Sequence, residues 1–254
     1  DKGSDFLPES IHDVLPPRAL SQSAEAFIEE SFQFQEIMMM YSSAIREVRT
    51  KLEILNDDLT MRNRRNPIEF ITHRVKKPVS IVNKLRKNGW EISASSVVEH
   101  LNDVAGIRVV CSFIDDIYDV AEMLGSQDDV TVIKIKDYIQ HPKPNGYRSY
   151  HMIVEIPVFF SDRTQNMRVE IQIRTIAMDF WASLEHQLKY KKHVENEEAI
   201  YQELKDCATT IAQVDEKMQA IRRKIESGMD DQELTPKEKL ERLGNGLMRP
   251  NFSN

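Results

Sequence analysis

The chain has 254 residues, with 34 Lys and Arg against 41 Asp and Glu, which gives a formal net charge of −7 at pH 7. This balance argues against binding nucleic acid through overall charge, although a local basic patch is compatible with it. Two cysteines are too few for a disulfide scaffold or a Cys-rich zinc site, and no apolar run reaches the roughly 18 residues of a membrane span. We therefore expect a cytoplasmic protein without membrane association.

The eight glycines exclude one large group of phosphate-binding proteins. None of their spacings gives a P-loop, and none forms the glycine-rich fingerprint of a dinucleotide-binding fold. If this protein binds phosphate groups, side chains must hold them.

In chain order, we expect an α/β (α+β) protein in three parts: a flexible segment over 1–20, a domain over 21–227 and a mobile tail over 228–254. Residues 1–4 resemble a tag remnant, and a capping box at 235–238 predicts one short helix that ends at 244. Long helices are expected near both ends of the domain, because apolar residues recur there at alternating spacings of four and three. The first stripe is Phe34, Met38, Tyr41, Ile45, Val48, Leu52, Leu55 and Leu59, and the second is Ile200, Leu204, Cys207, Ile211, Val214, Met218, Ile221 and Ile225.

Between these helices the pattern is that of a mixed α/β domain. Strands are predicted over 106–113, 130–139, 149–160 and 167–175. Helices are predicted over 115–126, which opens with acidic residues, and over 176–192. Another helix begins at Pro78, a residue that suits the first turn. Its core-facing residues are expected to be Val79, Ile81, Val82 and Leu85.

The last predicted strand carries polar chemistry on one face. Arg168, Glu170, Gln172 and Arg174 share that face, about 6–7 Å apart along the strand. Such a row either faces solvent or lines a site for a polyanionic ligand and its metal. Asp103, at the entrance of the strand predicted from 106, is a candidate second carboxylate beside Glu170, because Mg²⁺ typically uses one or two protein carboxylates together with substrate phosphates.

A basic stretch over 62–108 holds ten Lys and Arg against four Asp and Glu, an excess of six positive charges in an acidic protein. On the helix that begins at Pro78, one face carries Lys77, Ser80, Lys84 and Lys87. This face is either solvated or part of a phosphate site, and the charge concentration leaves the two interpretations even. Further along, Tyr147 follows a turn, where its ring either lies under a planar base or packs on a neighbouring strand.

Together and in this order, these segments resemble the synthetase domain of the RelA/SpoT homologue family, in particular its small single-domain alarmone synthetases of the RelP type. The resemblance covers roughly residues 30–225. The matching residues are Arg74-Val75-Lys76 with Ser80 and Lys84, then Asp103 to Arg108, Lys143 to His151, Val169 to Thr175, and Ala177 to Ala182 with Glu185-His186.

This resemblance implies a nucleotidyltransferase-like mixed sheet of about five strands, flanked by the long helices, and an enzyme, a GTP pyrophosphokinase. Such enzymes transfer the β,γ-pyrophosphate of ATP to the 3′-hydroxyl of GDP or GTP, which gives AMP and ppGpp or pppGpp, the alarmones of the stringent response. The implied cofactor is Mg²⁺, held by Asp103 and Glu170. Glu170 is also the implied base for the 3′-hydroxyl.

The same resemblance implies roles for the remaining residues. Arg74 and Arg108 are expected to sandwich the adenine of ATP, and Tyr147 is expected to stack on guanine. The residues expected at the ATP phosphates are Lys76, Ser80, Lys84 and Lys87. The residues expected to bind GDP or GTP are Lys136, Lys143, Asn145, Tyr147, His151, Gln172 and Asp179, of which Lys136, Lys143 and His151 match contacts to the 5′-phosphates.

Three features depart from the family pattern. Residue 179 is Asp where some relatives carry Asn, and its carboxylate can still accept hydrogen bonds from guanine N1–H and N2–H. The segment 134–137 resembles the basic variant of a loop that is acidic in other members, and it bears on the choice between GDP and GTP. The family's hydrolase residues are missing around His12-Asp13, so synthesis without hydrolysis is expected.

Two other interpretations remain. An RNA-binding regulator would hold single-stranded RNA with the 62–108 stretch and Tyr147, but it leaves Asp103 and Glu170 without a role. A structural protein would use the apolar stripes as a scaffold. The width of the stripes favours a helix–helix seam over burial against a sheet, either within one chain or also between the subunits of the homotetramer that the resemblance implies.

Overall fold

Five strands form one mixed sheet in the spatial order β1-β2-β5-β4-β3. The computed structural model describes residues 17–63, 65–190 and 197–232, and its strands are β1 (Ile68–Val75), β2 (Ala105–Cys111), β3 (Thr131–Asp137), β4 (Tyr150–Phe159) and β5 (Thr164–Thr175). β2 and β5 run parallel at the centre, and the other neighbouring pairs are antiparallel. The predicted mixed sheet of about five strands is confirmed.

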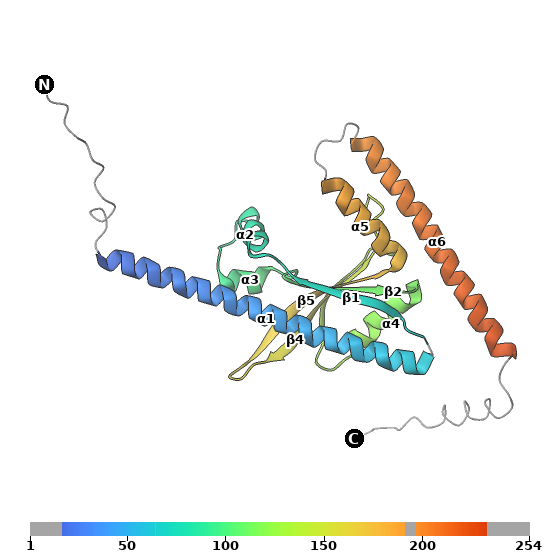
Figure 1. Ribbon diagram of the computed structural model, residues 1–254, viewed down its shortest axis with the longest axis horizontal. Coiled ribbons are helices and arrows are strands. Elements are labelled where there is room, and N and C mark those ends of the chain that lie inside the picture. The colour runs from blue at the N-terminus through green and yellow to red at the C-terminus, as the bar shows by residue number, and fades with distance from the viewer. Residues whose placement is uncertain (1–16, 64, 191–196, 233–254) are drawn as a thin grey trace, which may run out of the picture.

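The helices are α1 (Pro17–Asn63), α2 (Pro78–Lys87), α3 (Ala94–His100), α4 (Ile114–Gly125), α5 (Ile176–Tyr190) and α6 (Glu197–Gln232). Figure 1 shows α1 running along the sheet and α6 set apart from it, beside α5. Both long flanking helices are confirmed. Among the described residues, no helix has both the length and the apolar character to cross a membrane. The short helix predicted to end at 244 lies outside the described residues.

The apolar face of the sheet is buried under α1 and α4. Alternation along the strands turns Ile107 and Val109 of β2, and Ile171 of β5, to this face, where each is at most 2% exposed. The stripe of α1 covers them, and its Tyr41 and Leu52 are equally buried. The expectation of a helix–helix seam is wrong for this stripe, because the apolar side of four strands requires a cover of that width.

The second stripe is divided between two faces of α6. Leu204 and Ile211 pack toward α5, whereas Val214, Met218, Ile221 and Ile225 are each about half exposed. The buried face of α6 consists of Ala208, Ala212, Asp215 and Gln219. Small residues allow the helix to approach its neighbours closely, so α6 packs on α5 and α4 while α1 packs on the sheet. The two long helices therefore do not pair with each other over the described residues.

A buried ionic cluster fastens α6 to the beginning of α4. The carboxylate of Asp116, which is 1% exposed, accepts hydrogen bonds from Arg65 and Arg222. Both guanidinium groups lie over the ring of Phe113, 5.8 and 5.0 Å from its centre. A buried carboxylate with two charged donors is costly to break, so this cluster fixes where α6 lies relative to the sheet.

The sequence pattern did not predict β1 or α3, and it placed Val79 wrongly in the core. β1 is an edge strand in which only Ile68 is buried, so it lacks a clear alternating pattern. α3 has seven residues, too few for a helical period to show. α2 begins at Pro78 as expected, with Ile81 and Leu85 buried, but Val79 is 70% exposed because a helix this short buries a single i, i+4 pair.

Candidate functional site

The strand register brings the predicted site residues into two rows on the polar face of the sheet. One row crosses all five strands through Thr72, Arg108, Gln172, His151 and Lys136. The second row runs through Arg74, Gly106, Glu170, Ile153 and Lys134. Neighbouring strands lie about 4.8 Å apart. The residues expected to bind ATP therefore lie at the β1–β2 end, those expected to bind the acceptor lie toward β4 and β3, and Glu170 lies between them.

A cavity of about 170 Å³ opens on this face. It is lined by Thr72, His73, Arg74, Asp103, Gly106, Ile107, Arg108, Glu170 and Gln172. Gly106 leaves open the space that a side chain would occupy beside Glu170, as a strand glycine often does where a ligand approaches the backbone. The expected adenine-binding pair and both candidate metal ligands thus line one cavity.

Asp103 is held ionised by two lysines. Its Oδ2 accepts hydrogen bonds from Nζ of Lys76 at 2.6 Å and of Lys84 at 2.8 Å. Burial alone raises the pKa of this carboxyl, but the two ammonium groups outweigh that effect and hold the pKa below its ordinary value. The other oxygen, Oδ1, is buried and has no hydrogen-bond partner.

Glu170 is also a carboxylate at neutral pH. Its Oε2 accepts a hydrogen bond from Gln172 at 3.2 Å, and its Oε1 lies 3.5 Å from Nδ1 of His151. Burial raises the pKa of this carboxyl, His151 and Gln172 lower it, and the nearby charge of Asp103 raises it, with a net effect below the ordinary value. Glu170 can therefore accept a proton without first losing one.

The donor set fits a magnesium ion. Among residues 17–63, 65–190 and 197–232, no group of three or more His, Cys, Asp or Glu side chains is arranged to hold a metal. Asp103 and Glu170 nevertheless line the same cavity, and Oδ1 of Asp103 is a buried oxygen that lacks a partner. Mg²⁺ is commonly held by one or two carboxylates, with water and substrate phosphates as the remaining ligands.

Arg74 and Arg108 lie on neighbouring strands at the rim of the cavity. Burial lowers the pKa of Arg108 and the charge of Arg174 lowers it further, yet a guanidinium stays protonated. Nε of Arg108 is buried without a hydrogen-bond partner, and its Nη1 lies 3.4 Å from Oδ1 of Asp179. Two guanidinium planes on adjacent strands suit stacking on a planar base.

The acceptor end is organised around Tyr147. Its hydroxyl lies 2.8 Å from Nε2 of His151 and accepts a hydrogen bond from Arg174 at 2.6 Å. The ammonium group of Lys143 lies 4.6 Å from the centre of the Tyr147 ring. The side chain of Asn145 accepts a hydrogen bond from the Tyr147 backbone N–H and so shapes the turn.

Other predicted residues lie farther from the cavity. Ser80 and Lys87 are exposed on α2 and do not line it, although Lys84 on the same helix reaches Asp103. Lys136 is exposed on the edge strand β3. One residue of the site, Arg174, is missing from the set predicted by the resemblance. Its position on the polar face of β5, two residues after Gln172, is the signal that could have identified it.

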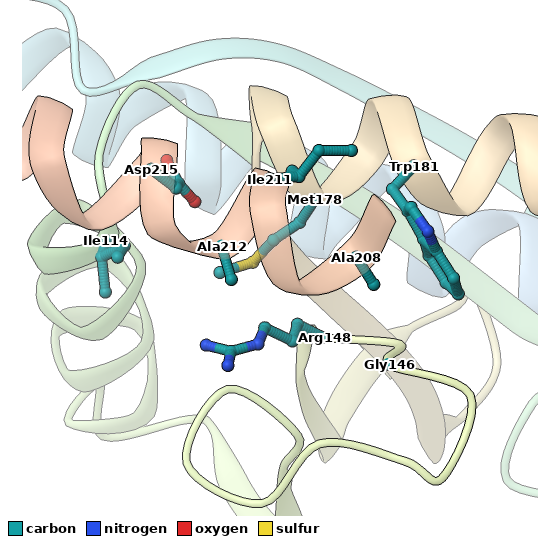
Figure 2. A pocket seen from close by; sticks show the side chains of 9 residues that line it. All are labelled: Ile114, Gly146, Arg148, Met178, Trp181, Ala208, Ile211, Ala212 and Asp215. Atoms are coloured by element: carbon teal, nitrogen blue, oxygen red, sulfur yellow. The ribbon is translucent and has the colours of Figure 1, made fainter. Parts of the chain in front are cut away.

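The turn before Tyr147 rests against α6. Gly146 and Arg148 lie beneath Ala208, Ala212 and Asp215 of α6 (Figure 2), and these residues line a second, small cavity of about 20 Å³. Gly146 has a φ of 86°, and a Cβ atom added to it would lie 2.5 Å from Cβ of Ala208. This cavity is lined mostly by apolar groups and contains neither candidate metal ligand, so the polar cavity on the sheet is the better candidate for the chemistry.

Comparison with known proteins gives the family. The model of the family described as "Region found in RelA / SpoT proteins" matches residues 73–195. The chain is 45% identical to the GTP pyrophosphokinase YwaC of Bacillus subtilis over 74% of its own length and 90% of that protein.

Two solved structures of small alarmone synthetase 1 from Bacillus subtilis have the same fold. The structure bound to its product pppGpp matches with a TM-score of 0.68 and 36% identity, covering 76% of this chain and 98% of that one. The structure bound to AMPCPP matches with a TM-score of 0.63 and 34% identity, covering 77% of this chain and 98% of that one.

Proposed function

The chain belongs to the RelA/SpoT family as a small alarmone synthetase, a GTP pyrophosphokinase, and from this premise we propose how its residues divide the reaction. The 3′-oxygen of GDP or GTP attacks the β-phosphorus of ATP. The bond from that phosphorus to the oxygen shared with the α-phosphate breaks, AMP leaves, and the 3′-hydroxyl gives up its proton. The observation that supports this proposal is the register, in which Glu170 of β5 lies between Gly106 of β2, beside Arg74 of β1, and Ile153 of β4.

We assign ATP to the β1–β2 end. Arg74 and Arg108 stack on the adenine, while Lys76 and Lys84 neutralise the phosphates, with Ser80 and Lys87 as outer contacts. The two lysines bind Asp103, which lines the cavity. Transfer of a phosphoryl-type group depends mostly on positioning and charge neutralisation, which is what this cluster supplies.

We assign the guanine nucleotide to the β4–β3 end. Tyr147 stacks on guanine, Gln172 and Asp179 offer hydrogen-bonding groups to its edge, and Asn145 shapes the turn. Lys136, Lys143 and His151 bind the 5′-phosphates. The exposed position of Lys136 on an edge strand gives an acceptor phosphate room to approach from solvent. The preference for GDP or GTP then depends on how many of the 5′-phosphates Lys136, Lys143 and His151 contact.

Glu170 is the proposed base for the 3′-hydroxyl, since its lowered pKa keeps it ionised at neutral pH. Asp103 and Glu170 are the residues that would hold Mg²⁺, which supplies positive charge to the transferred pyrophosphate when bound.

We further propose a homotetramer and a cytoplasmic location, where ATP and guanine nucleotides are abundant. The outer faces of α5 and α6 expose Phe180, Val214 and Met218 at 50–58%, and these residues line one apolar groove of the kind that subunits bury. Single-stranded RNA binding by the 62–108 stretch stays a prediction. Its check is the steep loss of affinity with added salt that phosphate contacts produce.

The reaction is tested with the purified chain, ATP, GDP and Mg²⁺, by separating the nucleotides on an anion-exchange column. AMP and ppGpp should appear in equal amounts, and both should disappear when EDTA replaces the metal. AMP without ppGpp would show hydrolysis of ATP in place of transfer and would contradict the proposed acceptor site. The same assay with GTP measures acceptor preference.

A further inference from the structure

Arg174 is a buried cation inside the acceptor half of the site. It is 4% exposed, and four of its N–H groups donate to side chains of the surrounding segments. The acceptors are Ser149 Oγ at 3.3 Å, Asp179 Oδ1 at 3.1 Å, Tyr147 Oη at 2.6 Å and Gln172 Oε1 at 3.0 Å. A guanidinium has about five N–H donors in a rigid plane, so this side chain is almost fully used.

Three of these partners belong to the proposed binding site for GDP or GTP, and they come from separate segments. Tyr147 belongs to the turn before β4, Gln172 to β5 and Asp179 to α5. The guanidinium of Arg174 also lies 5.2 Å from the centre of the Tyr147 ring. One planar group therefore joins the ring of Tyr147, the amide of Gln172 and the carboxylate of Asp179.

We propose that Arg174 is a positioning residue that holds Tyr147, Gln172 and Asp179 in the geometry that receives the guanine base, before the acceptor nucleotide arrives. The inference rests on the acceptor assignments proposed above. Arg174 does not touch the substrate, because it is buried beneath these partners. Its charge is balanced by Asp179, which also faces Arg108 at 3.4 Å, so the same carboxylate borders the ATP end.

The first test is Arg174→Lys, which keeps the positive charge for Asp179 and removes the planar fork. Loss of two or three oriented hydrogen bonds should raise the KM for GDP about tenfold, while the KM for ATP changes less than about twofold. Arg163→Lys is the matched control. This arginine lies in the turn before β5, where it pairs with Glu36 and Asp162 at the surface, and its substitution should leave both constants unchanged.

Tyr147→Phe is the second test, and it does not depend on whether Arg174→Lys folds. It keeps the stacking ring and removes the hydroxyl, which contacts both Arg174 and His151, so the KM for GDP should rise about threefold to tenfold. In the double variant the increase should be smaller than the product of the two single increases, because both changes remove the same contact. A merely structural role for Arg174 predicts independent effects.

The outcomes separate this inference from the assignment on which it rests. If Tyr147→Ala leaves the KM for GDP unchanged, the acceptor site itself is misplaced. If Tyr147→Ala raises it while Tyr147→Phe does not, the ring binds guanine without help from Arg174, and the inference is overturned. Equal increases in the KM values for ATP and GDP in a folded Arg174→Lys protein would overturn it as well.

Discussion

Asp103 and Glu170 are kept ionised by different neighbours, and this difference suits different tasks. Two lysines bind one oxygen of Asp103, and its other oxygen is buried without a hydrogen-bond partner. Glu170 is held by an amide and an imidazole, groups that leave it able to accept a proton. A family pattern can indicate that both acids matter, but only their surroundings show which one is already neutralised by cations.

Glu170→Gln is expected to remove transfer while leaving nucleotide affinity nearly intact. The amide keeps the shape but cannot take the proton, and loss of a general base typically lowers the rate by roughly 10²–10⁴-fold. Single-turnover kinetics and equilibrium binding of both nucleotides check the two parts separately. Glu69→Gln is the control, since Glu69 is an exposed β1 residue bonded to Ser112. A variant at Glu170 that retains more than about a tenth of the rate would show that another group is the base.

At the scale of elements, the inner face of α6 packs against the turn that contains Gly146 and precedes Tyr147. Ala208 leaves just enough room for Gly146, and the indole N–H of Trp181 on α5 donates to the carbonyl of Leu204 at 2.9 Å. Close approach of a turn to a helix needs small residues on both sides, which explains why the buried positions of α6 are not its largest apolar ones.

Ala208→Leu is therefore expected to raise the KM for GDP about tenfold and to lower the free energy of unfolding by about 1–3 kcal/mol through overpacking. The added carbons would displace the turn that carries Tyr147, whereas Arg74 and Arg108 at the other end of the sheet would be unaffected. Steady-state kinetics and thermal unfolding provide the measurements. Gln213→Leu, at an exposed position of the same helix that does not line the groove beside this turn, should change neither quantity. A lower stability with an unchanged KM would mean that the turn is positioned without α6.

A buried acid on α6 makes stability depend on pH. Asp215 accepts a hydrogen bond from Thr175, at the junction of β5 and α5, at 2.6 Å. Burial raises the pKa of Asp215 above its ordinary value of 3.8, and the bond from Thr175 lowers it only in part. Because the folded-state pKa is raised, ionised Asp215 lowers stability at neutral pH, and this cost disappears as the pH falls below the ordinary value.

Asp215→Asn should consequently raise the Tm at pH 7 by a few degrees, and the difference from the wild type should shrink toward pH 4. The amide oxygen can still accept the hydrogen bond from Thr175. Differential scanning calorimetry at several pH values checks the trend, with the exposed neighbour Glu216→Gln as the control. A Tm that falls at pH 7 and recovers toward pH 4 would show instead that ionised Asp215 stabilises the fold.

At the scale of the molecule, residues 17–63, 65–190 and 197–232 leave apolar side chains on the outer face of α6 exposed. Val214 and Met218 are 51% and 50% exposed, and they border a groove formed with α5. Ile211, on the same stripe, is partly buried and packs against Trp181 and Ala182 within the chain. A test of assembly should therefore avoid Ile211.

If the proposed tetramer forms through this surface, Val214→Asp together with Met218→Asp should give a smaller particle without unfolding the chain. Both residues lie outside the core, and a charge at a subunit seam is strongly unfavourable. Multi-angle light scattering gives the mass, and circular dichroism shows whether the fold is kept. Lys217→Asp is the control on a neighbouring exposed position. A wild-type protein that scatters as a 29.5 kDa particle would rule out the proposed assembly.

Residue patterns were sufficient for the central strands and both long helices, because the alternation of β5 and the heptad spacing of α1 are local properties. The family motifs were sufficient to find Asp103, Glu170 and Tyr147 as candidates. Patterns failed at β1, whose edge position buries only Ile68, and at Val79, which shares its helix's composition but not its buried face.

The folded chain was required for everything that depends on register and on contacts between distant segments. Only strand pairing aligns Arg108, Gln172 and His151 in one row, because one residue of slip would turn each of them to the other face of the sheet. Only packing shows that Arg174 joins a turn, a strand and a helix, and that α6 buries its alanines while its larger apolar residues face outward. A stripe of apolar residues specifies that a surface must be covered, and the position of every other element decides what covers it.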